Sequence, residues 1–419
     1  MKELTTKGTK DTTGKELKTL PEGWVWTTLQ EAAKINGRDP EIRDLPDDLP
    51  VTFVPMAAVD ATSGTIANPV VRPLKEVRKG FTPFSDGDVI IAKITPCMEN
   101  GKAAIARNLV NGRGFGSTEF HVFRPKVELL PEFLFHFIRQ ESFRKDAKAQ
   151  FAGTAGQLRV PASFLYDYQM PLPPLPEQER IVDRLEELLS DLEAGVAALE
   201  RVRAGVKRYK ASVLKATFEA RPEHEWRRLG DVTRVLRGAS PRPKGNPKYF
   251  GGTIPWIKIS DVTREEGKFL TTTVDTVTPE GVKKSRYLSR GSLILSICAT
   301  VCVPKILGVD GCIHDGFVYF PDLSEGVDTS YLYFFFESIR SKVIQENRQG
   351  MTQVNLNTGI VSNFHVPLPP LPDQERIVAE VERRLESVRV VEAAVEAGLK
   401  RAARLRQSVL KKAFEGKLS

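Results

Sequence analysis

The sequence has few of the residues that build catalytic and metal sites. Its 419 residues include only four cysteines and five histidines. Four cysteines in so long a chain do not make a disulfide framework. Cys298, Cys302, Cys312 and His314 match no standard metal-ligand spacing, so we interpret the cysteines as buried thiols and expect no metal. The five histidines are scattered and give no obvious acid–base pair.

Nucleotide and methyl-transfer motifs are missing as well. The sequence has no GxxxxGK(S/T) phosphate-binding loop. It also has no Asn/Asp-Pro-Pro-aromatic run of the kind that amino-methyltransferases use. Asp146 and Lys148 fit only half of a nuclease triad. We therefore expect a non-catalytic protein without a cofactor of its own.

Long hydrophobic runs are absent too. No stretch approaches about eighteen consecutive apolar residues, so we expect no membrane span. Residues 1–18 are polar and lack the apolar segment of a signal peptide. We interpret them as a flexible arm and expect a cytoplasmic protein. The formal net charge of +8 points to a polyanionic partner, because phosphate contacts need Lys and Arg.

The chain contains an internal repeat. Residues 170–182 read MPLPPLPEQERIV and residues 366–378 read VPLPPLPDQERIV, with eleven of thirteen positions identical at an offset of 196. At the same offset, SVLKATFE (212–219) faces SVLKKAFE (408–415). Two matches at one offset mean that the whole stretch between them is a repeated element. The order of segments is variable module (19–168), constant segment (169–222), variable module (223–365) and constant segment (366–419).

Each constant segment predicts a long helix. The prolines Pro171, Pro173, Pro174 and Pro176 cannot lie inside a helix, so we expect it to begin after them, from about Glu177 to Lys215. Apolar residues then recur every three or four positions, a pattern typical of a coiled coil. The predicted pairing residues are Ile181, Leu185, Leu188, Leu192 and Leu199 in the first segment and Ile377, Val381, Leu385, Val395 and Leu399 in the second. The two stripes also include Val196, Val202, Val206, Tyr209, Val213, Val388, Val391, Ala402, Leu405 and Val409.

The charges of the two helices predict how they pair. Residues 177–200 contain eight acids and two bases, whereas residues 201–215 contain six bases and no acid. The second helix likewise changes from a net charge of −3 over 373–396 to +6 over 397–412. Antiparallel pairing sets each acidic half against a basic half, and parallel pairing would oppose like charges. The same polarity also complements each helix dipole. We expect an antiparallel coiled coil with pseudo-two-fold symmetry.

The variable modules have the pattern of mixed α+β domains. Short β-branched runs bounded by turn residues predict strands, and each module has one helix late in its span, at 131–146 and 328–346. The predicted strands are Val51–Val54, Val89–Ile94, Phe120–Phe123, Thr253–Ile259, Ser292–Ile297 and Phe317–Phe320. Two related but diverged modules on a fixed spacer are suited to binding two half-sites at a fixed separation, which is the geometry of dimeric DNA-binding proteins.

Candidate DNA contacts lie where strands end among Lys, Thr, Asn and Gly. Short polar side chains and Lys beside Gly suit close approach to phosphates and base edges, although each residue alone also fits an ordinary solvated surface. In the first module the candidates are Lys93, Thr95, Asn100, Lys102, Arg113, Ser117, Gln157 and Arg159. In the second module they are Arg237, Arg242, Lys244, Lys258, Ser260, Lys305, Arg348, Gln353 and Asn355.

The duplicated proline boxes, each opening a long helix after a variable module, resemble those of the specificity subunits of type I restriction–modification enzymes. Two runs inside the modules also look like that family's target-recognition domains, IIAKITPCMENGK (90–102) and GTIPWIKISDV (252–262). The resemblance covers nearly the whole chain beyond residue 18. The run from Ser296 to Lys305 departs from it, because it lacks the Asn-Gly-Lys of the first module.

The resemblance implies a bipartite DNA target, with one half bound by each module and an unread spacer set by the helices. It further implies that the helices dock two modification subunits, which bind S-adenosylmethionine and methylate adenine. Two restriction subunits that use ATP and magnesium would join that core. In the family the specificity subunit carries none of those active sites, which agrees with the absences noted above.

Three other interpretations stay open from the residues. A coiled-coil scaffold for proteins would explain the helices but not two diverged basic modules. A fused methyltransferase or nuclease lacks a supporting motif. A specificity module of another methylation-based defence system would differ only in its partners. The sequence alone does not identify the target, the spacer length or the oligomeric state.

Overall fold

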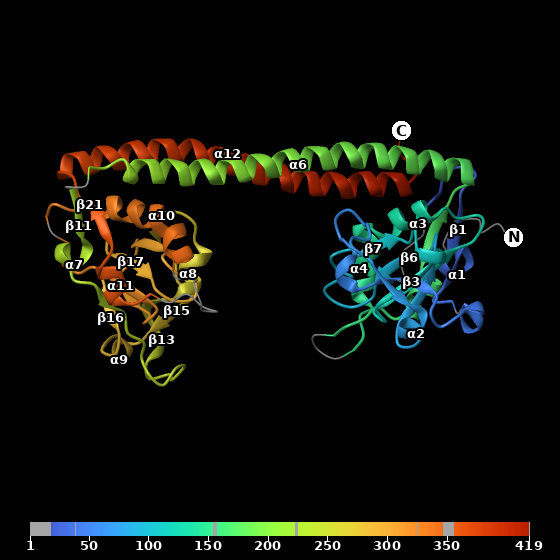
Figure 1. The fold of residues 1–419 in the computed structure, drawn as a ribbon, viewed down its shortest axis with the longest axis horizontal. Coiled ribbons are helices and arrows are strands. Elements are labelled where there is room, and N and C mark those ends of the chain that lie inside the picture. Colours follow the sequence, from blue (N-terminus) through green and yellow to red (C-terminus); the bar gives the residue numbers. More distant parts are fainter. Residues whose placement is uncertain are drawn as a thin grey trace. The chain divides into compact units, whose positions relative to one another are not determined.

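The computed structural model describes residues 18–37, 39–153, 157–222, 225–323, 325–346 and 356–418. Apart from Lys18, the arm expected at the N-terminus lies outside these residues. The contacts divide the chain into two units, residues 1–198 with 398–419 and residues 199–397. Each unit contains one variable module and one half of each long helix (Figure 1).

The first module is built from short strands and helices that precede the first long helix. In chain order they are β1 (Val25–Thr28), α1 (Leu29–Ala32), β2 (Ala33–Ile35), η1 (Pro40–Asp44), β3 (Pro50–Val54), η2 (Met56–Ala58), β4 (Val70–Pro73), α2 (Leu74–Val77), β5 (Thr82–Ser85), β6 (Val89–Ala92), β7 (Ala103–Ile105), η3 (Val110–Gly112), β8 (Arg113–Gly116), β9 (Phe120–Pro125), α3 (Pro131–Ile138), α4 (Glu141–Ala149), α5 (Ala162–Asp167) and β10 (Gln169–Leu172).

These strands form two four-stranded sheets and one closing pair. The sheets have the orders β2-β9-β6-β7 and β4-β3-β8-β5, and β1 pairs antiparallel with β10. Strands β6 and β9 are apolar on both faces, because α3 covers one face and the second sheet lies on the other. The pairing of β1 with β10 brings the two ends of the module side by side.

The second module repeats this plan. Its elements are β11 (Trp226–Arg228), α7 (Leu229–Val232), β12 (Leu236–Arg237), β13 (Phe250–Ile257), α8 (Ile259–Arg264), β14 (Phe269–Leu270), β15 (Asp275–Val277), α9 (Pro279–Val282), β16 (Arg286–Leu288), β17 (Leu293–Ser296), β18 (Pro304–Leu307), β19 (Gly311–Ile313), β20 (Phe317–Tyr319), α10 (Thr329–Glu346), α11 (Thr358–Ser362) and β21 (His365–Pro367).

The sheets of the two modules correspond strand by strand. The orders β12-β20-β17-β18-β14 and β15-β13-β19-β16 match those of the first module, with β14 as an additional edge strand. A parallel pair, β3 with β8 or β13 with β19, lies within an otherwise antiparallel sheet of each module, and the additional strand β14 also pairs parallel with β18. The pair of β11 with β21 closes the second module as β1 and β10 close the first. The predicted α+β class and the internal repeat are therefore confirmed.

The two long helices are α6 (Leu175–Glu219) and α12 (Leu371–Phe414), and they run antiparallel in each unit (Figure 1). In the first unit Glu193 pairs with Arg406 at 3.1 Å. In the second unit Arg203 pairs with Glu396 at 3.0 Å. Each pair joins an acidic half of one helix to a basic half of the other, which confirms the antiparallel pairing predicted from charge.

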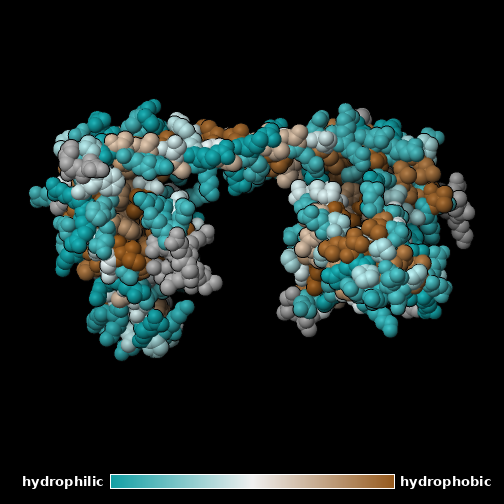
Figure 2. Space-filling model, in the orientation of Figure 1, coloured by the Kyte–Doolittle hydropathy of each residue, from teal (hydrophilic) through white to brown (hydrophobic). Residues whose placement is uncertain are grey.

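All ten predicted pairing residues are buried or half-buried. Near the module, Ile181 and Leu185 pack into the core of the first unit rather than along the helix pair alone. Four other members of the apolar stripes are exposed, namely Val202, Tyr209, Val391 and Leu405. Figure 2 shows apolar patches along the long helices, whereas hydrophilic residues cover much of the visible face of each unit. The stripe is therefore wider than the contact between the two helices.

The repeated sequence SVLKATFE (212–219) and SVLKKAFE (408–415) supplies a core phenylalanine to each module. Phe414 near the end of α12 is buried against Phe133 and Phe137 of α3, with ring centroids 4.9 and 5.3 Å away. In the second unit Phe218 near the end of α6 lies 5.1 Å from Tyr331 of α10. The C-terminal end of α12 thus completes the core of the first module, which precedes α6 in the chain. The C-terminal end of α6 likewise completes the core of the second module, which precedes α12.

The repeated proline-rich sequence at 170–182 and 366–378 supplies a buried glutamine to each module. Gln178 is fully buried and donates to the carbonyl oxygens of Glu128 at 2.8 Å and Pro173 at 2.9 Å. The amide N–H of Leu130 donates to its side-chain oxygen at 2.9 Å. Gln374 makes the equivalent three hydrogen bonds in the second unit. These glutamines satisfy buried backbone groups just before α3 and α10, and thereby fix each module on its helix.

Two helix predictions were wrong in detail. The helix predicted over 131–146 is two helices, with a break at Arg139 and Gln140. The first long helix begins before Glu177, so that Pro176 lies in its first turn. A proline is tolerated there, because the amide that it lacks would have no partner in the helix.

Candidate nucleic-acid interface

In the first module, Lys93 follows β6, Glu119 precedes β9, and Arg159 from the segment before α5 binds Glu119. Arg159 donates from Nε and Nη2 to the two carboxylate oxygens of Glu119, at 2.8 and 2.9 Å. Its Nη1 donates to the carbonyl oxygen of Gln157 at 3.0 Å. The hydrogen bonds from Arg159 lower the pKa of Glu119, and the nearby charge of Lys93 lowers it further. Glu119 is therefore ionised at neutral pH.

The segment around Arg159 is held on both sides by backbone hydrogen bonds. Arg159 exchanges two hydrogen bonds with Ala152, at 2.9 and 3.0 Å. The amide of Thr95 donates to the carbonyl of Leu158, and the amide of Val160 donates to the carbonyl of Lys93. These two hydrogen bonds join the loop after β6 to the segment before α5. This arrangement fixes the backbone from which Arg159 projects.

Buried His121 forms a hydrogen bond with the backbone of that segment. One ring nitrogen lies 2.9 Å from the carbonyl oxygen of Val160, and the other lies 2.9 Å from the side-chain nitrogen of Asn36. Burial lowers the pKa of His121, and Lys93 lowers it too. The ring is therefore neutral and donates to the Val160 carbonyl while it accepts from Asn36.

The structure places the other predicted residues of the first module in two groups. Thr95 and Gln157 are half-buried or exposed beside Arg159, Asn100 is exposed in the loop after β6, and the Ser117 hydroxyl accepts a hydrogen bond from the amide of Glu119 at 3.2 Å. Two predicted contacts instead bind within the module: Lys102 donates to the carbonyl of Met56, and Arg113 pairs with Asp39 and Glu41.

In the second module Asp315 gathers a set of polar side chains just before β20. Its carboxylate accepts from the Ser240 hydroxyl at 2.7 Å and lies 3.1 Å from His314 Nε2. Arg237 donates to its backbone carbonyl at 2.7 Å, and exposed Arg242 lies 3.7 Å from its carboxylate. Burial opposes the ionisation of Asp315, but these hydrogen bonds and cations lower its pKa overall.

His314 stands among cations in this cluster. Burial lowers its pKa, Asp315 opposes that change, and the charges of Arg242, Lys244 and Lys258 lower the pKa further. Its ring also contacts Trp256 edge to face, with centroids 5.9 Å apart. Since Lys244 is exposed, the cluster combines an exposed positive charge with a half-buried imidazole that packs on the buried Trp256.

The remaining candidates of the second module have different surroundings. Lys258 pairs with Asp275, and Ser260 is exposed in the first turn of α8. Lys305 is only 4% exposed, and its ammonium donates to the carbonyls of Glu265 and Gly267. Lys305 therefore holds a loop in place inside the module and is not a surface residue. Three further candidates, Arg348, Gln353 and Asn355, lie outside the described residues.

The two clusters occupy equivalent places in the fold. The amide of Lys93 donates to the carbonyl of Glu119, and the amide of Ile297 donates to the carbonyl of Gly316 in the corresponding position of the second module. Each cluster therefore lies where the loop after the central strand meets the start of its neighbour. The first presents a Glu–Arg pair and the second a His–Asp pair, so the same surface has different chemistry in each module.

Sequence reasoning missed Glu119, His314 and Asp315. Glu119 comes immediately before the predicted strand Phe120–Phe123, and His314 and Asp315 come within three residues of the predicted strand Phe317–Phe320. Attention to the residues that flank matching strands in the two modules would have found these positions. Their partners, however, come from segments far away in the sequence, which no local pattern indicates.

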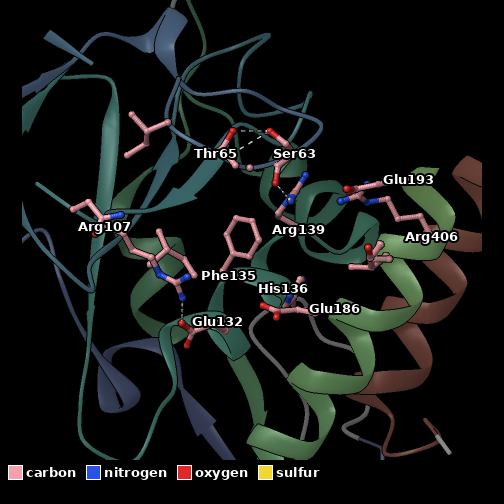
Figure 3. Close-up of a pocket in the computed structure, with 16 residues that line it drawn as sticks. Ser63, Thr65, Arg107, Glu132, Phe135, His136, Arg139, Glu186, Glu193 and Arg406 are labelled. Carbon is pink, nitrogen blue, oxygen red and sulfur yellow. Dashed lines mark hydrogen bonds and ion pairs between the residues drawn. The ribbon is translucent and has the colours of Figure 1, made fainter. Parts of the chain in front are cut away.

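A cavity of about 460 Å³ in the first unit lies where the module meets the long helices (Figure 3). Arg139 is 8% exposed and donates to the carbonyls of Ala61 and Thr62, while its guanidinium lies over the ring of Phe135. Arg406 donates to the same Thr62 carbonyl at 3.2 Å and pairs with Glu193. The two arginines thus attach a loop of the module to the helix pair.

Other kinds of site have little support in the part of the chain that the structure describes. No three histidine, cysteine, aspartate or glutamate side chains gather there as metal ligands. Cys302 and Cys312 are buried, and burial raises the pKa of both thiols. None of the described helices has the length and apolar character needed to cross a membrane.

Comparisons with known proteins agree with the repeat. A family model described as the type I restriction modification DNA specificity domain matches residues 21–201 and again residues 223–386. The EcoKI specificity subunit of Escherichia coli strain K12 is 25% identical over 441 residues, which cover 96% of this chain and 90% of that protein. The EcoAI specificity subunit of Escherichia coli is 42% identical over 172 residues. That match spans 41% of this chain and only 29% of the EcoAI subunit.

Two solved structures share the fold. A chain from a study of complex assembly and conformational transition of the type I R-M system has a TM-score of 0.80 at 24% identity, and the match covers 96% of this chain and 100% of that one. The HsdS subunit from Thermoanaerobacter tengcongensis has a TM-score of 0.54 at 24% identity, with 96% and 98% covered.

Proposed function

Because this chain belongs to the family of type I restriction–modification DNA specificity domains, we propose that it binds a bipartite DNA sequence, one half through each module. The observation that carries this proposal is the pair of equivalent clusters with different side chains. A shared backbone frame with Glu119 and Arg159 in one module, and with His314 and Asp315 in the other, suits two different half-sites.

The surrounding cations support a nucleic-acid partner. Lys93 in the first cluster and Lys244 in the second form no ion pair among the described residues, and Arg242 is 73% exposed with only a 3.7 Å ion pair to Asp315. Such side chains are suited to phosphates, whose neutralisation makes binding fall steeply with salt. The rest of each cluster is held by internal hydrogen bonds, so it presents a fixed pattern of donors and acceptors.

The exposed apolar residues of the long helices support a second role. Val202, Tyr209, Val391 and Leu405 are 40–52% exposed, and the neighbouring Val390 is 63% exposed. We propose that these helices dock two modification subunits, which bind S-adenosylmethionine and methylate adenine, and that two restriction subunits with ATP and magnesium join them. In this proposal the chain itself supplies sequence selection and spacing, and no catalytic group.

A map of adenine methylation tests the proposal. The chain is co-expressed with its neighbouring modification subunit in a host without DNA methylation, and methyladenine is located across the genome. We expect a split motif with a fixed unread gap that is absent when this chain is omitted. Replacing residues 19–168 with the same module of a relative should change one half of the motif only. A stable complex of the two proteins that methylates nothing would contradict the proposal.

A further inference from the structure

We propose that Arg159, held by Glu119, recognises a guanine in the major groove of the half-site that the first module binds. This inference rests on the proposed function, and it names one base and one side chain within it.

Arg159 keeps hydrogen-bond donors that its contacts within the described part of the module do not use. A guanidinium has five N–H groups. In the described structure Nε, Nη2 and Nη1 each use one N–H, two on Glu119 and one on the Gln157 carbonyl. Among the described residues one N–H then stays available on each terminal nitrogen. Two neighbouring coplanar donors match the O6 and N7 acceptors of guanine, which is the commonest specific contact in the major groove.

The charge of the Arg159–Glu119 pair favours a base over a phosphate as its partner. The carboxylate of Glu119 neutralises Arg159 through two short hydrogen bonds, and the pKa of Glu119 is lowered, so that the pair carries no net charge at neutral pH. A phosphate gains little from a neutral pair and is repelled by the carboxylate beside it. The edge of guanine is uncharged and gains the same two hydrogen bonds without that repulsion. Lys93, which lies close to Glu119, is better suited to the neighbouring phosphate.

The backbone and the guanidinium of Arg159 are both held in place. A side chain that selects a base must hold its donors in one orientation before DNA arrives. The backbone of Arg159 is bonded to Ala152 on one side, while the adjacent residues are bonded to the loop at 93–95 on the other. The guanidinium is fixed from two directions, by Glu119 and by the Gln157 carbonyl, and the side chain is nevertheless 38% exposed. Arg159 is thus both accessible and preorganised.

The test compares methylation motifs of the complex with its modification subunit. We expect the wild-type motif to contain a guanine in the half that changes when the first module is exchanged. Arg159→Ala should accept other bases at one such guanine and leave the second half unchanged. Arg159→Lys should relax the same position, because it keeps a charge beside Glu119 but loses the planar fork. Arg107→Ala is the matched control, since Arg107 pairs with Glu132 in the same module, outside the cluster.

A chemical substitution in the DNA then isolates the contact. Replacing the chosen guanine with 7-deazaguanine removes N7 and should weaken binding of the wild-type complex by roughly tenfold or more. The same substitution should have no effect on binding by the Arg159→Ala complex, which has no side-chain donor at this position. Thermal melting of each variant establishes that it is folded, and Arg159→Lys preserves an ion pair should Arg159→Ala not fold.

Three results would overturn the inference. An unchanged motif for both variants would assign Arg159 to structure alone. A uniform fall in methylation without relaxed selection would assign it to a phosphate. A first half-site without guanine would exclude the contact directly. The failure of the proposed function is distinguishable from all three, because the wild-type complex would then produce no split motif.

Discussion

The buried glutamines of the two proline boxes allow a sharp prediction about stability. Gln178→Ala removes one acceptor and two donors from a site without solvent exposure. The Leu130 amide and the carbonyls of Glu128 and Pro173 then lose their partners. A buried polar group without a partner costs about 1–3 kcal/mol. The bond to Pro173 is buried and the other two are part-buried, so we expect a loss of about 3 kcal/mol in the free energy of unfolding of the first unit.

The assay is denaturation combined with amide hydrogen exchange. For a unit of this size, about 3 kcal/mol corresponds to a fall in melting temperature of about 6–12 °C. The Leu130 amide should exchange faster in Gln178→Ala, and the Asp328 amide should do so in Gln374→Ala. Gln345→Ala is the matched control, because Gln345 is an exposed helical residue, and it should change stability by less than about 0.5 kcal/mol. A Gln178→Ala variant as stable as this control would refute the reasoning.

Three further predictions concern other contacts. The pKa of His136 is lowered by burial to about 3, so protons bind the unfolded chain preferentially below its ordinary value of 6.5. Wild-type stability should fall by about 2 kcal/mol between pH 7 and pH 5, and His136→Gln should lack this part of the fall in denaturation curves measured at both pH values. The pair of Arg203 with Glu396 is half-exposed, so a double-mutant cycle should give a coupling below about 1 kcal/mol, and a value above 2 would contradict its surface character. Tyr331→Phe leaves the carbonyl of Pro367 without its 2.8 Å partner and should cost about 1–2 kcal/mol in urea denaturation, whereas no change would mean that water replaces the hydroxyl.

Much of the fold could be predicted because the chain repeats itself. The matching boxes located both long helices, and the separation of their charges predicted antiparallel pairing, which Glu193 and Arg406 confirm. The break between α3 and α4 could not be predicted, since neither Pro nor Gly occurs there. It coincides with Arg139, whose guanidinium binds carbonyls of a loop that is distant in the sequence. Tertiary contacts of this kind override local helix propensity.

The candidate site was less accessible to prediction. A basic residue beside a strand has the same local pattern whether it faces solvent or a neighbouring loop. Lys93 and Lys305 illustrate this point: both were predicted to contact DNA, but Lys305 is buried and donates to the carbonyls of Glu265 and Gly267. Glu119 was passed over because an acidic residue is not expected near DNA. Its role emerges only with Arg159, forty residues later.

The anchoring of Phe414 in the first unit has a consequence for synthesis of the chain. Leu410, Phe414 and Leu418 complete the core that Phe133 and Phe137 begin, but they are made after the entire second module. About 200 residues separate the two parts of this unit, or roughly 10–40 s on the ribosome at 5–20 residues per second. During that interval the nascent first module exposes an apolar face that only the last turns of the chain can cover. Ribosomes that stop before residue 410 would therefore release a first module that is prone to aggregate, even though its own sequence is complete.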